Sequence, residues 1–236
     1  MYKLLQWNIW NNENIDNIVE ELARFDADIV CVQELIIREN DESNLEKLKS
    51  IYPFVYFEIA DAFHDGKIQG NAILSKYEIV DKKARFVQLP SSEINDYSRE
   101  GRIYLEADVN FGGKILHIGT THLSYTNAFV ETPQKDLEVN TLLGYLKMHE
   151  DNFIFTGDLN AESTSKYVKA IKKHLKYFET GCTWTTKEFS YKGFHASTLS
   201  YTIDHVFASK DINIISAETM DTSYSDHLPI LVIFKM

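Results

Sequence analysis

The sequence FIFTGDLN, at residues 153–160, gives the clearest local signal in this chain and sets the pattern for its fold. Its opening residues are apolar or β-branched and predict a buried strand, which Gly157 is expected to end. Asp158 and Asn160 follow at once, so a carboxylate and a carboxamide share one turn. Turns use the same residue types to bond their own backbone, so this motif alone does not define a site.

An apolar run with polar residues at one end recurs along the chain. Four other runs carry such a tip and a further segment begins with it, at residues 4–8, 29–34, 115–122, 201–207 and 225–234. If these strands lie side by side, their tips converge at one edge. The converging side chains are then Asn8, Glu34, His122, Asp158, Asn160, Asp204, Asp226 and His227.

The intervening segments favour an α/β fold in a single domain over residues 1–236. Helical periodicity predicts helices at residues 14–25, 41–52 and 163–177, and another that begins at Thr132-Pro133 and carries Leu137, Leu142 and Leu146. Strands are expected at residues 54–59, 72–75, 79–89 and 103–109, with a hairpin turn at 111–113 and a pair of strands near Tyr201 and Ile212. Two stacked sheets covered by helices would explain this mixture.

Composition limits the class of protein. Hydrophobic residues make up 44% of the chain and charged residues 25%, as in packed globular domains. No apolar run approaches the roughly 20 residues that span a bilayer, so we expect no membrane insertion, a cytoplasmic location and a monomer. Cys31 and Cys182 are expected to be reduced packing residues. The net charge of −11 argues against a broad basic surface for nucleic acid without excluding one.

Glu34 and Asn8 offer hard oxygen ligands at neighbouring strand ends. Such ligands suit Mg²⁺ or Mn²⁺, which retain several waters and bind through one or two carboxylates together with substrate phosphate. The sequence has no His and Cys grouping of the kind that zinc prefers. Taken alone, Glu34 is more readily explained as a solvent-facing carboxylate at a strand end.

Asp204 and His227 suggest a catalytic pair. A buried carboxylate bonded to one imidazole nitrogen fixes the tautomer and leaves the other nitrogen to accept a proton from water. Neighbours on a strand point to opposite faces, so Asp204 and His205 cannot both face the site, and we expect His205 to be a core or partly exposed histidine. His122 can donate to a phosphate oxygen. Together with a metal, these groups describe a site for phosphoryl hydrolysis.

These motifs occur in a fixed order along nearly the whole chain: Trp7-Asn8, Gln33-Glu34, Thr121-His122-Leu123, Gly157-Asp158-Leu159-Asn160, Ile203-Asp204-His205 and Ser225-Asp226-His227. The ordered set resembles the endonuclease/exonuclease/phosphatase (DNase-I-like) superfamily. The resemblance implies a four-layer α/β/β/α sandwich of two mostly antiparallel sheets flanked by helices. It also implies Mg²⁺-dependent or Mn²⁺-dependent cleavage of phosphate esters.

The resemblance assigns a role to each motif residue. Asn8 and Glu34 would hold the metal, with Asp226 near the metal or the phosphate. Asp158 and Asn160 would position the nucleophile and the phosphate. Asp204 would orient His227, and His122 would contact the scissile phosphate. Whether His227 or Asp158 accepts the proton of the attacking water stays open.

Two residues depart from the abasic-site endonucleases of the superfamily. Those enzymes carry an aspartate where this chain has Trp10 and a tyrosine motif where it has His122. The histidine form is more similar to DNase-I-like nucleases, tyrosyl-DNA phosphodiesterases, sphingomyelinases and inositol-polyphosphate phosphatases. We expect Trp10, Tyr125, Arg102 and Trp184 to bind substrate, although for Arg102 a structural role is the favoured alternative.

The substrate class is the least determined feature. Lys166, Lys169, Lys173 and Lys176 recur at helical spacing, which predicts a solvated helix face more readily than a track for a polyanion. The aromatic loop at residues 184–194 could stack bases, enter lipid headgroups or cap the core. A phosphodiesterase acting on nucleic acid is the favoured hypothesis. A phospholipid or small-molecule phosphoesterase comes second, and a non-catalytic binding module third.

Overall fold

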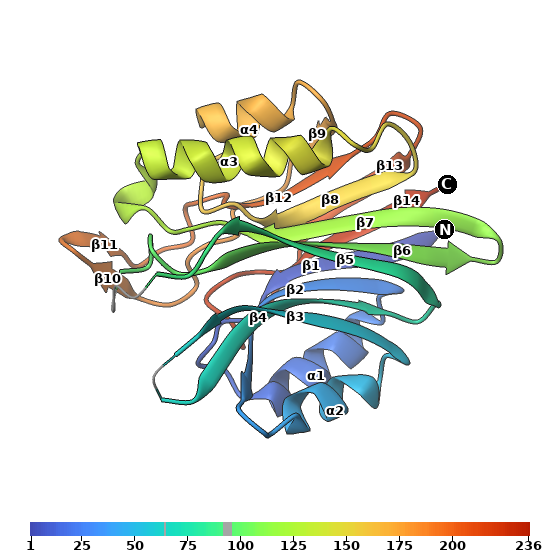
Figure 1. Cartoon of the computed structure of the whole chain (residues 1–236), viewed down its shortest axis with the longest axis horizontal. Coiled ribbons are helices and arrows are strands. Elements are labelled where there is room, and N and C mark those ends of the chain that lie inside the picture. Colours follow the sequence, from blue (N-terminus) through green and yellow to red (C-terminus); the bar gives the residue numbers. More distant parts are fainter. Residues whose placement is uncertain (64, 92–95) are drawn as a thin grey trace.

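The structure, a computed structural model, describes residues 1–63, 65–91 and 96–236. Two β-sheets stack face to face, and helices cover the outer face of each (Figure 1). The predicted four-layer α/β/β/α sandwich of mostly antiparallel sheets is therefore confirmed. None of the helices in these ranges is long and apolar enough to cross a membrane.

The first sheet has the strand order β13-β14-β1-β2-β4-β3. Its strands are β1 (Tyr2–Asn8), β2 (Ile29–Arg38), β3 (Phe54–Ala62), β4 (Lys67–Ser75), β13 (Asn213–Thr219) and β14 (Ile230–Lys235). Only the β1–β2 pairing among those described is parallel. A parallel pair needs a crossover, which α1 (Ile15–Phe25) supplies. With α2 (Ser43–Lys49), α1 covers this sheet.

The second sheet has the order β5-β6-β7-β8-β12-β9. Its strands are β5 (Ile79–Gln88), β6 (Arg102–Phe111), β7 (Lys114–His122), β8 (Phe153–Asp158), β9 (Lys176–Phe178) and β12 (Asp204–Ala208). The parallel pair β7–β8 is connected through η1 (Asn127–Phe129) and α3 (Pro133–Leu146). A fourth helix, α4 (Lys166–Ile171), lies beside α3, and β10 (Phe189–Tyr191) and β11 (Phe194–Ala196) form a separate hairpin.

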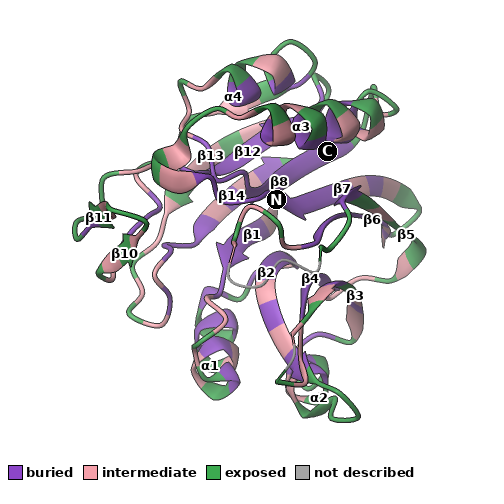
Figure 2. Cartoon of the chain, turned by 60° about the vertical axis from the view of Figure 1, so that its left-hand side comes forward, coloured by how far each residue is buried: buried purple, intermediate pink, exposed green. Residues whose placement is uncertain are grey.

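Apolar side chains form a layer on each side of both sheets. One cluster fills the space between the sheets and includes Leu4, Ile118 and Val206. Two more clusters lie between each sheet and its helices. β8 is buried along its whole length, because protein covers both of its faces. Strands in this position are rich in apolar residues. Figure 2 shows the buried strands between helices whose outward faces are exposed.

Strand direction brings the polar tips to one edge. In the parallel pairs, Asn8 lies opposite Gln33 and His122 lies opposite Asp158. Because β12 runs antiparallel to β8, its first residue, Asp204, is the partner of Asp158 at the same edge. The carboxyl ends of β1, β7 and β8 therefore meet the amino end of β12 and the middle of β2, where Gln33 and Glu34 lie. The segment before β14 arrives at the same place.

Several sequence predictions about the elements were wrong. The fourth helix ends at Ile171 rather than at residue 177, and Lys176 begins β9, so the four lysines do not share one helix face. Leu137 is exposed rather than part of the buried face of α3. The expected strand pair near Tyr201 and Ile212 does not form, since β12 and β13 belong to different sheets. In each case tertiary packing overrides a local periodicity.

Candidate active site

A pocket of about 360 Å³ opens at the edge where the polar tips converge. Most of the predicted site residues line it, namely Trp10, Glu34, Arg102, His122, Tyr125, Asp158, Asn160, Trp184, Asp226 and His227. Asn8 and Asp204 lie just behind this lining and contact it through hydrogen bonds. The structure thus brings together all the residues that the motifs singled out.

Gly157 allows Asp158 to reach this edge. The prediction that Gly157 ends the strand was wrong, because β8 continues through Asp158. A Cβ atom on Gly157 would lie 2.3 Å from the carbonyl oxygen of Thr121 on β7. Only glycine permits this close approach of the two strands, and the approach sets Asp158 beside His122.

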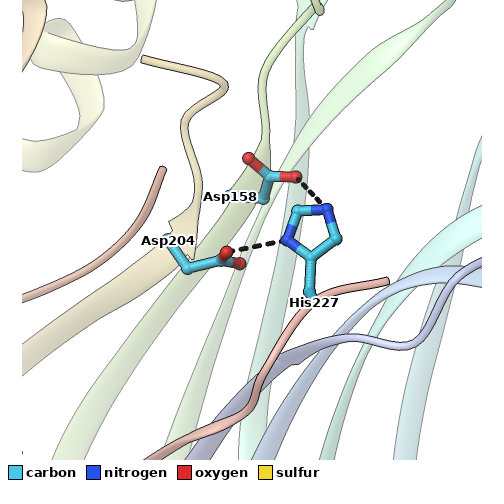
Figure 3. A group of neighbouring side chains, drawn as sticks. All are labelled: Asp158, Asp204 and His227. Atoms are coloured by element: carbon cyan, nitrogen blue, oxygen red, sulfur yellow. Dashed lines mark hydrogen bonds and ion pairs between the residues drawn. The ribbon is translucent and has the colours of Figure 1, made fainter. Parts of the chain in front are cut away.

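Asp204, His227 and Asp158 form a buried chain of polar contacts (Figure 3). Nδ1 of His227 lies 2.8 Å from Oδ2 of Asp204, and Nε2 lies 3.7 Å from Oδ2 of Asp158. The backbone of His227 is fixed on both sides, since its N–H donates to Ser225 Oγ and its carbonyl accepts from Trp7 Nε1. The ring therefore has one orientation, with Nε2 toward the pocket. His205 lies in the core and contacts the carbonyl oxygen of Ala161 instead.

Carboxylates dominate the electrostatics around His227. Burial opposes the charged ring, but Asp204, Asp226 and Asp158 together raise the pKa of His227 to about 10. Burial, followed by the charge of Asp204, raises the pKa of Asp158 to about 7. Both groups therefore hold a proton more readily than the free side chains do. This edge carries more negative charge than the protein itself neutralises.

The donor atoms of Asp158, Asp204 and His227 all lie within 4.8 Å of one another, which is compatible with a metal site. However, Asp204 Oδ2 is already bonded to His227 Nδ1. A carboxylate and an imidazole that bond each other in this way act as an oriented pair rather than as two free ligands. Glu34 and Asp226 are better placed to hold a cation.

Glu34 reaches the pocket through an irregularity in β2. The register of β2 against β4 shifts between Val32 and Leu35, and Glu34 has a φ of 60°. This bulge breaks the alternation that would otherwise follow Gln33, and bulges commonly redirect side chains at functional sites. Oε1 of Glu34 accepts from Asn8 Nδ2 and Oε2 accepts from the backbone of Asn11, both at 3.0 Å.

Asp226 presents an oxygen that has no hydrogen bond. Its Oδ2 accepts from the indole nitrogen of Trp184 at 3.0 Å, whereas the buried Oδ1 has no hydrogen bond to the described residues and lies 4.0 Å from Nε2 of His227. Glu34 and Asp226 both line the pocket, and burial, followed by the charge of Asp226, raises the pKa of Glu34. A buried carboxylate oxygen without a donor is costly unless a cation or water reaches it. This donor set fits a hard divalent cation.

Asn8 is placed differently from the expected metal ligand. Its oxygen accepts from the backbone N–H of Trp10, and its nitrogen donates to both Glu34 and Asp158 at 3.0 Å. In this arrangement Asn8 links two carboxylates and offers no free oxygen to the pocket. Its role as a metal ligand stays a prediction.

His122 and Asn160 present N–H groups to the pocket. Arg102 Nη1 lies 3.1 Å from Nδ1 of His122. Because a guanidinium only donates, Nδ1 accepts and the hydrogen of the neutral ring is on Nε2. Burial and the charge of Arg102 lower the pKa of His122, which keeps the ring neutral. The side-chain nitrogen of Asn160 contacts Nε2 at 3.0 Å and donates to the carbonyl oxygen of Leu123 at 3.0 Å, which holds the two side chains next to each other.

Arg102 itself is almost fully buried. It donates to the Glu100 carboxylate at 2.7 Å and to the carbonyl oxygen of Tyr97 at 3.2 Å, in addition to its contact with His122. These contacts place Arg102 behind His122. Its predicted role in binding substrate stays a prediction.

Aromatic rings form the wall of the pocket. Of the predicted substrate-binding residues, Trp10, Tyr125 and Trp184 line it, and Phe189 of the β10–β11 hairpin joins them. Trp184 also packs in a small core cluster with Ile203, so this part of the aromatic loop caps the core. Whether the rings contact a substrate stays a prediction.

Sequence reasoning missed two groups that support the site. Gln33 donates to Thr120 at 2.9 Å and so ties the two sheets together beneath the pocket. Lys135 on α3 is fully buried and donates to the backbone on both sides of the site. Its spacing from Val139, Leu142 and Leu146 places it on the apolar stripe of the helix. A lysine on an apolar stripe is the sequence pattern that could have identified Lys135 as a buried residue.

Comparisons with known proteins agree with this geometry. The model of the Endonuclease/Exonuclease/phosphatase family matches residues 5–227. No curated protein matches the chain. Several solved structures share its fold. One, described as an endonuclease/exonuclease/phosphatase from Beutenbergia cavernae, has a TM-score of 0.80 and 18% identity and is matched over 100% of this chain and 71% of its own.

Two further structures have more specific descriptions. A mannosyl-6-phosphatase from Bacteroides thetaiotaomicron has a TM-score of 0.73 and 17% identity, with 100% of each chain covered. TDP2 from D. rerio, complexed with a single-strand DNA product, has a TM-score of 0.69 and 19% identity, with 100% of this chain and 99% of its own covered. At such identities the likeness establishes the fold alone. The family match over nearly the whole sequence, together with this fold, shows that the chain belongs to the endonuclease/exonuclease/phosphatase family of hydrolases that act on phosphoester bonds.

Proposed function

We propose that this chain is a divalent-metal-dependent phosphodiesterase and that its substrate is the end of a nucleic-acid strand. The observation that carries the proposal is the position of His227. Asp204 orients its ring, and Nε2 faces a pocket that also presents Glu34 and the unpaired oxygen of Asp226. A proton acceptor, a cation site and phosphate donors in one pocket are what hydrolysis of a phosphoester requires.

Glu34 and Asp226 would hold the cation, with Asn8 positioning Glu34. Oδ1 of Asp226, which has no hydrogen bond to the described residues, and the carboxylate of Glu34 in the same pocket support this assignment. Bound Mg²⁺ or Mn²⁺ would neutralise charge that develops on the phosphate oxygens.

The location of the protein stays a prediction, as do the single domain and the monomeric state.

The protein side chains would then act as follows. The carboxylates around His227 raise its pKa to about 10, which favours the protonated ring. A cation held by Glu34 and Asp226 would offset this negative charge and lower that pKa, so that Nε2, oriented by Asp204, could accept the proton of the attacking water. His122 and Asn160 donate to the phosphate oxygens. Asn160 Nδ2 contacts His122 Nε2 at 3.0 Å and both residues line the pocket, so a phosphate oxygen there would be within reach of both side chains.

The aromatic wall supports a strand end rather than continuous duplex. A bounded pocket of about 360 Å³ accepts one nucleotide-sized group, and rings such as Trp10 and Phe189 can stack on a base. TDP2, which shares the fold, is described with a DNA product, which is consistent with this class of substrate.

A small sugar phosphate is the second candidate. Arg102 and Lys187 are the arginine and lysine side chains in the pocket lining within the described ranges, and Arg102 is bonded to Glu100. With a net charge of −11, the chain offers little attraction to a long polyanion. A mannosyl-6-phosphatase also shares the fold.

The test is a panel of substrates at fixed protein concentration. Bis-p-nitrophenyl phosphate, a single-stranded oligonucleotide and mannose 6-phosphate would each be incubated with Mg²⁺, Mn²⁺ or EDTA. We expect cleavage of the oligonucleotide with either metal, none with EDTA, and loss in Glu34→Gln. Glu106→Gln, a remote buried carboxylate, is the matched control. Hydrolysis of mannose 6-phosphate alone would select the second candidate, and full activity in EDTA would contradict the metal site.

A further inference from the structure

The first turns of α3 contain a buried cation and a buried anion. Lys135 and Glu138 are both 0% exposed. A lysine is rarely placed in a core, because its ammonium group loses hydration unless other groups replace the lost contacts. Burial accordingly lowers the pKa of Lys135 to about 7, against the opposing charges of Glu138 and Asp158. Such a costly residue needs specific partners, and its partners here are backbone atoms.

Lys135 bonds two carbonyl groups on different loops. Its Nζ lies 2.6 Å from the carbonyl oxygen of Ser124 and 2.6 Å from that of Asn160. Glu138 binds the other side of the same loop, since its Oε2 accepts from the backbone N–H of Ser124 at 3.0 Å. One face of α3 therefore holds the peptide groups on both sides of Ser124.

The helix that carries this pair is itself fixed. The Thr132 hydroxyl caps the backbone N–H of Lys135 at 3.2 Å. Tyr167 of α4 then donates to the carbonyl of Thr132 and accepts from its N–H. Because the start of α3 is bound to α4, Nζ of Lys135 occupies a set position rather than following the loops that it contacts.

One of these two loops follows His122, and the other follows Asp158 and carries Asn160. Ser124 is two residues after His122, and Asn160 is two residues after Asp158. Leu123 connects them further, because its N–H donates to the carbonyl of Asp158 at 2.9 Å and its own carbonyl accepts from the Asn160 side chain at 3.0 Å. Lys135 closes this set of contacts from behind.

We propose that Lys135 is a positioning residue for the reaction: it sets the spacing of His122 and Asn160 by binding the backbone of both loops. The proposal rests on the proposed function, in which these two side chains donate to the substrate phosphate. Lys135 does not touch the pocket chemistry itself. Its effect is on geometry, and displacements of about 1 Å in such donors cost on the order of a hundredfold in rate.

Lys135→Met tests the proposal, because methionine keeps a long unbranched side chain but cannot donate. We expect kcat to fall on the order of 10-fold to 100-fold with KM changed less than about threefold, since the two donors matter most in the transition state. Leu142→Ala, a buried position on the same helix, is the matched control. It should lower thermal stability at least as much while kcat stays within about threefold.

Backbone hydrogen exchange gives a readout that needs no activity. In Lys135→Met, amide exchange at Ser124 and Asn160 should accelerate while Val206 of β12 stays protected. If the wild type hydrolyses no phosphoester, the proposed function fails, but this exchange experiment still decides whether Lys135 orders the loops. If Lys135→Met does not fold, Glu138→Gln weakens the same arrangement and should give a smaller fall in kcat with faster exchange at Ser124.

The proposal is overturned if the folded variants keep wild-type kcat, or if exchange in both loops is unchanged. It is also overturned if Leu142→Ala loses kcat in proportion to its loss of stability, since the effect of Lys135 would then be general destabilisation.

Discussion

Two histidine–carboxylate pairs have the same contact distance, and they differ in what surrounds them. His227 and Asp204 approach to 2.8 Å at the pocket edge. His149 and Glu106 also approach to 2.8 Å, away from the pocket. Glu106 in addition contacts Lys83 at 3.2 Å and accepts from Tyr104 at 3.1 Å. The remote carboxylate is thus saturated with donors.

The surroundings of His227 leave groups unsatisfied. Its Nε2 faces Asp158 across 3.7 Å, and the nearby Asp226 has an unbonded oxygen. The ring of His149, by contrast, stacks on Phe153 with centroids 4.4 Å apart. A histidine–carboxylate pair is therefore no sign of catalysis in itself. The excess of carboxylates and the open pocket distinguish the candidate active site from a structural ion pair.

The largest difference in kcat is expected between the variants that lack His227 and His149. His227→Ala is expected to lower kcat by about 10²-fold to 10⁴-fold, because the proton acceptor is lost. His149→Ala should leave kcat within about threefold. Steady-state hydrolysis of whichever substrate the wild type cleaves measures both.

Thermal unfolding is the control for this pair, since both side chains are largely buried and either change can destabilise the fold. Comparable losses of kcat in the two variants, with both proteins folded at the assay temperature, would show that the comparison does not identify the catalytic histidine.

A smaller effect is expected from the indole nitrogen that binds Asp226. Trp184→Phe keeps an aromatic ring in the wall but removes the donor at 3.0 Å from Oδ2. Loss of a hydrogen bond that orients a ligand typically weakens metal affinity by about 10-fold to 100-fold. Isothermal titration with Mn²⁺ would measure this, with Glu106→Gln as the remote control. Unchanged affinity in Trp184→Phe would argue that Asp226 is not a metal ligand.

The convergence of the candidate site could be predicted from sequence because it depends on local patterns. Asn8, His122 and Asp158 are the last residues of their strands, and Asp204 is the first residue of a strand that runs in the opposite direction. Strand direction therefore brings these polar residues to one edge. The layered fold follows from the same alternation of helices and strands. These features need no knowledge of which side chains meet.

Other features could not be predicted, because they depend on contacts between distant segments. The bulge that turns Glu34 toward the pocket appears only in the register of β2 against β4. The end of α4 is set by the pairing of β9 with β12, which takes residues that could have continued a helix. The role of Lys135 requires two loops that are separated from each other by the whole of α3.

The pair of His149 and Glu106 should affect stability rather than activity. We expect this to be the smallest of the three predicted effects. Burial disfavours the charged form of Glu106, but the contacts with His149 and Lys83 outweigh it and lower its pKa from 4.5 to about 2. A carboxylate whose pKa is depressed in the folded state stabilises the fold above its unfolded pKa, and this contribution is lost as pH falls from 4.5 through 2.

Glu106→Gln should therefore reduce the free energy of unfolding at pH 5 by about 1–2 kcal/mol, a figure discounted because Lys83 is partly exposed. The difference between variant and wild type should shrink when urea unfolding is repeated at pH 3. A constant difference at both values would mean that Glu106 acts through packing and not through its charge. Because Glu106 lies outside the pocket, Glu106→Gln should not change kcat. A loss of stability without a loss of activity would identify Glu106 and His149 as a structural ion pair, in contrast to Asp204 and His227.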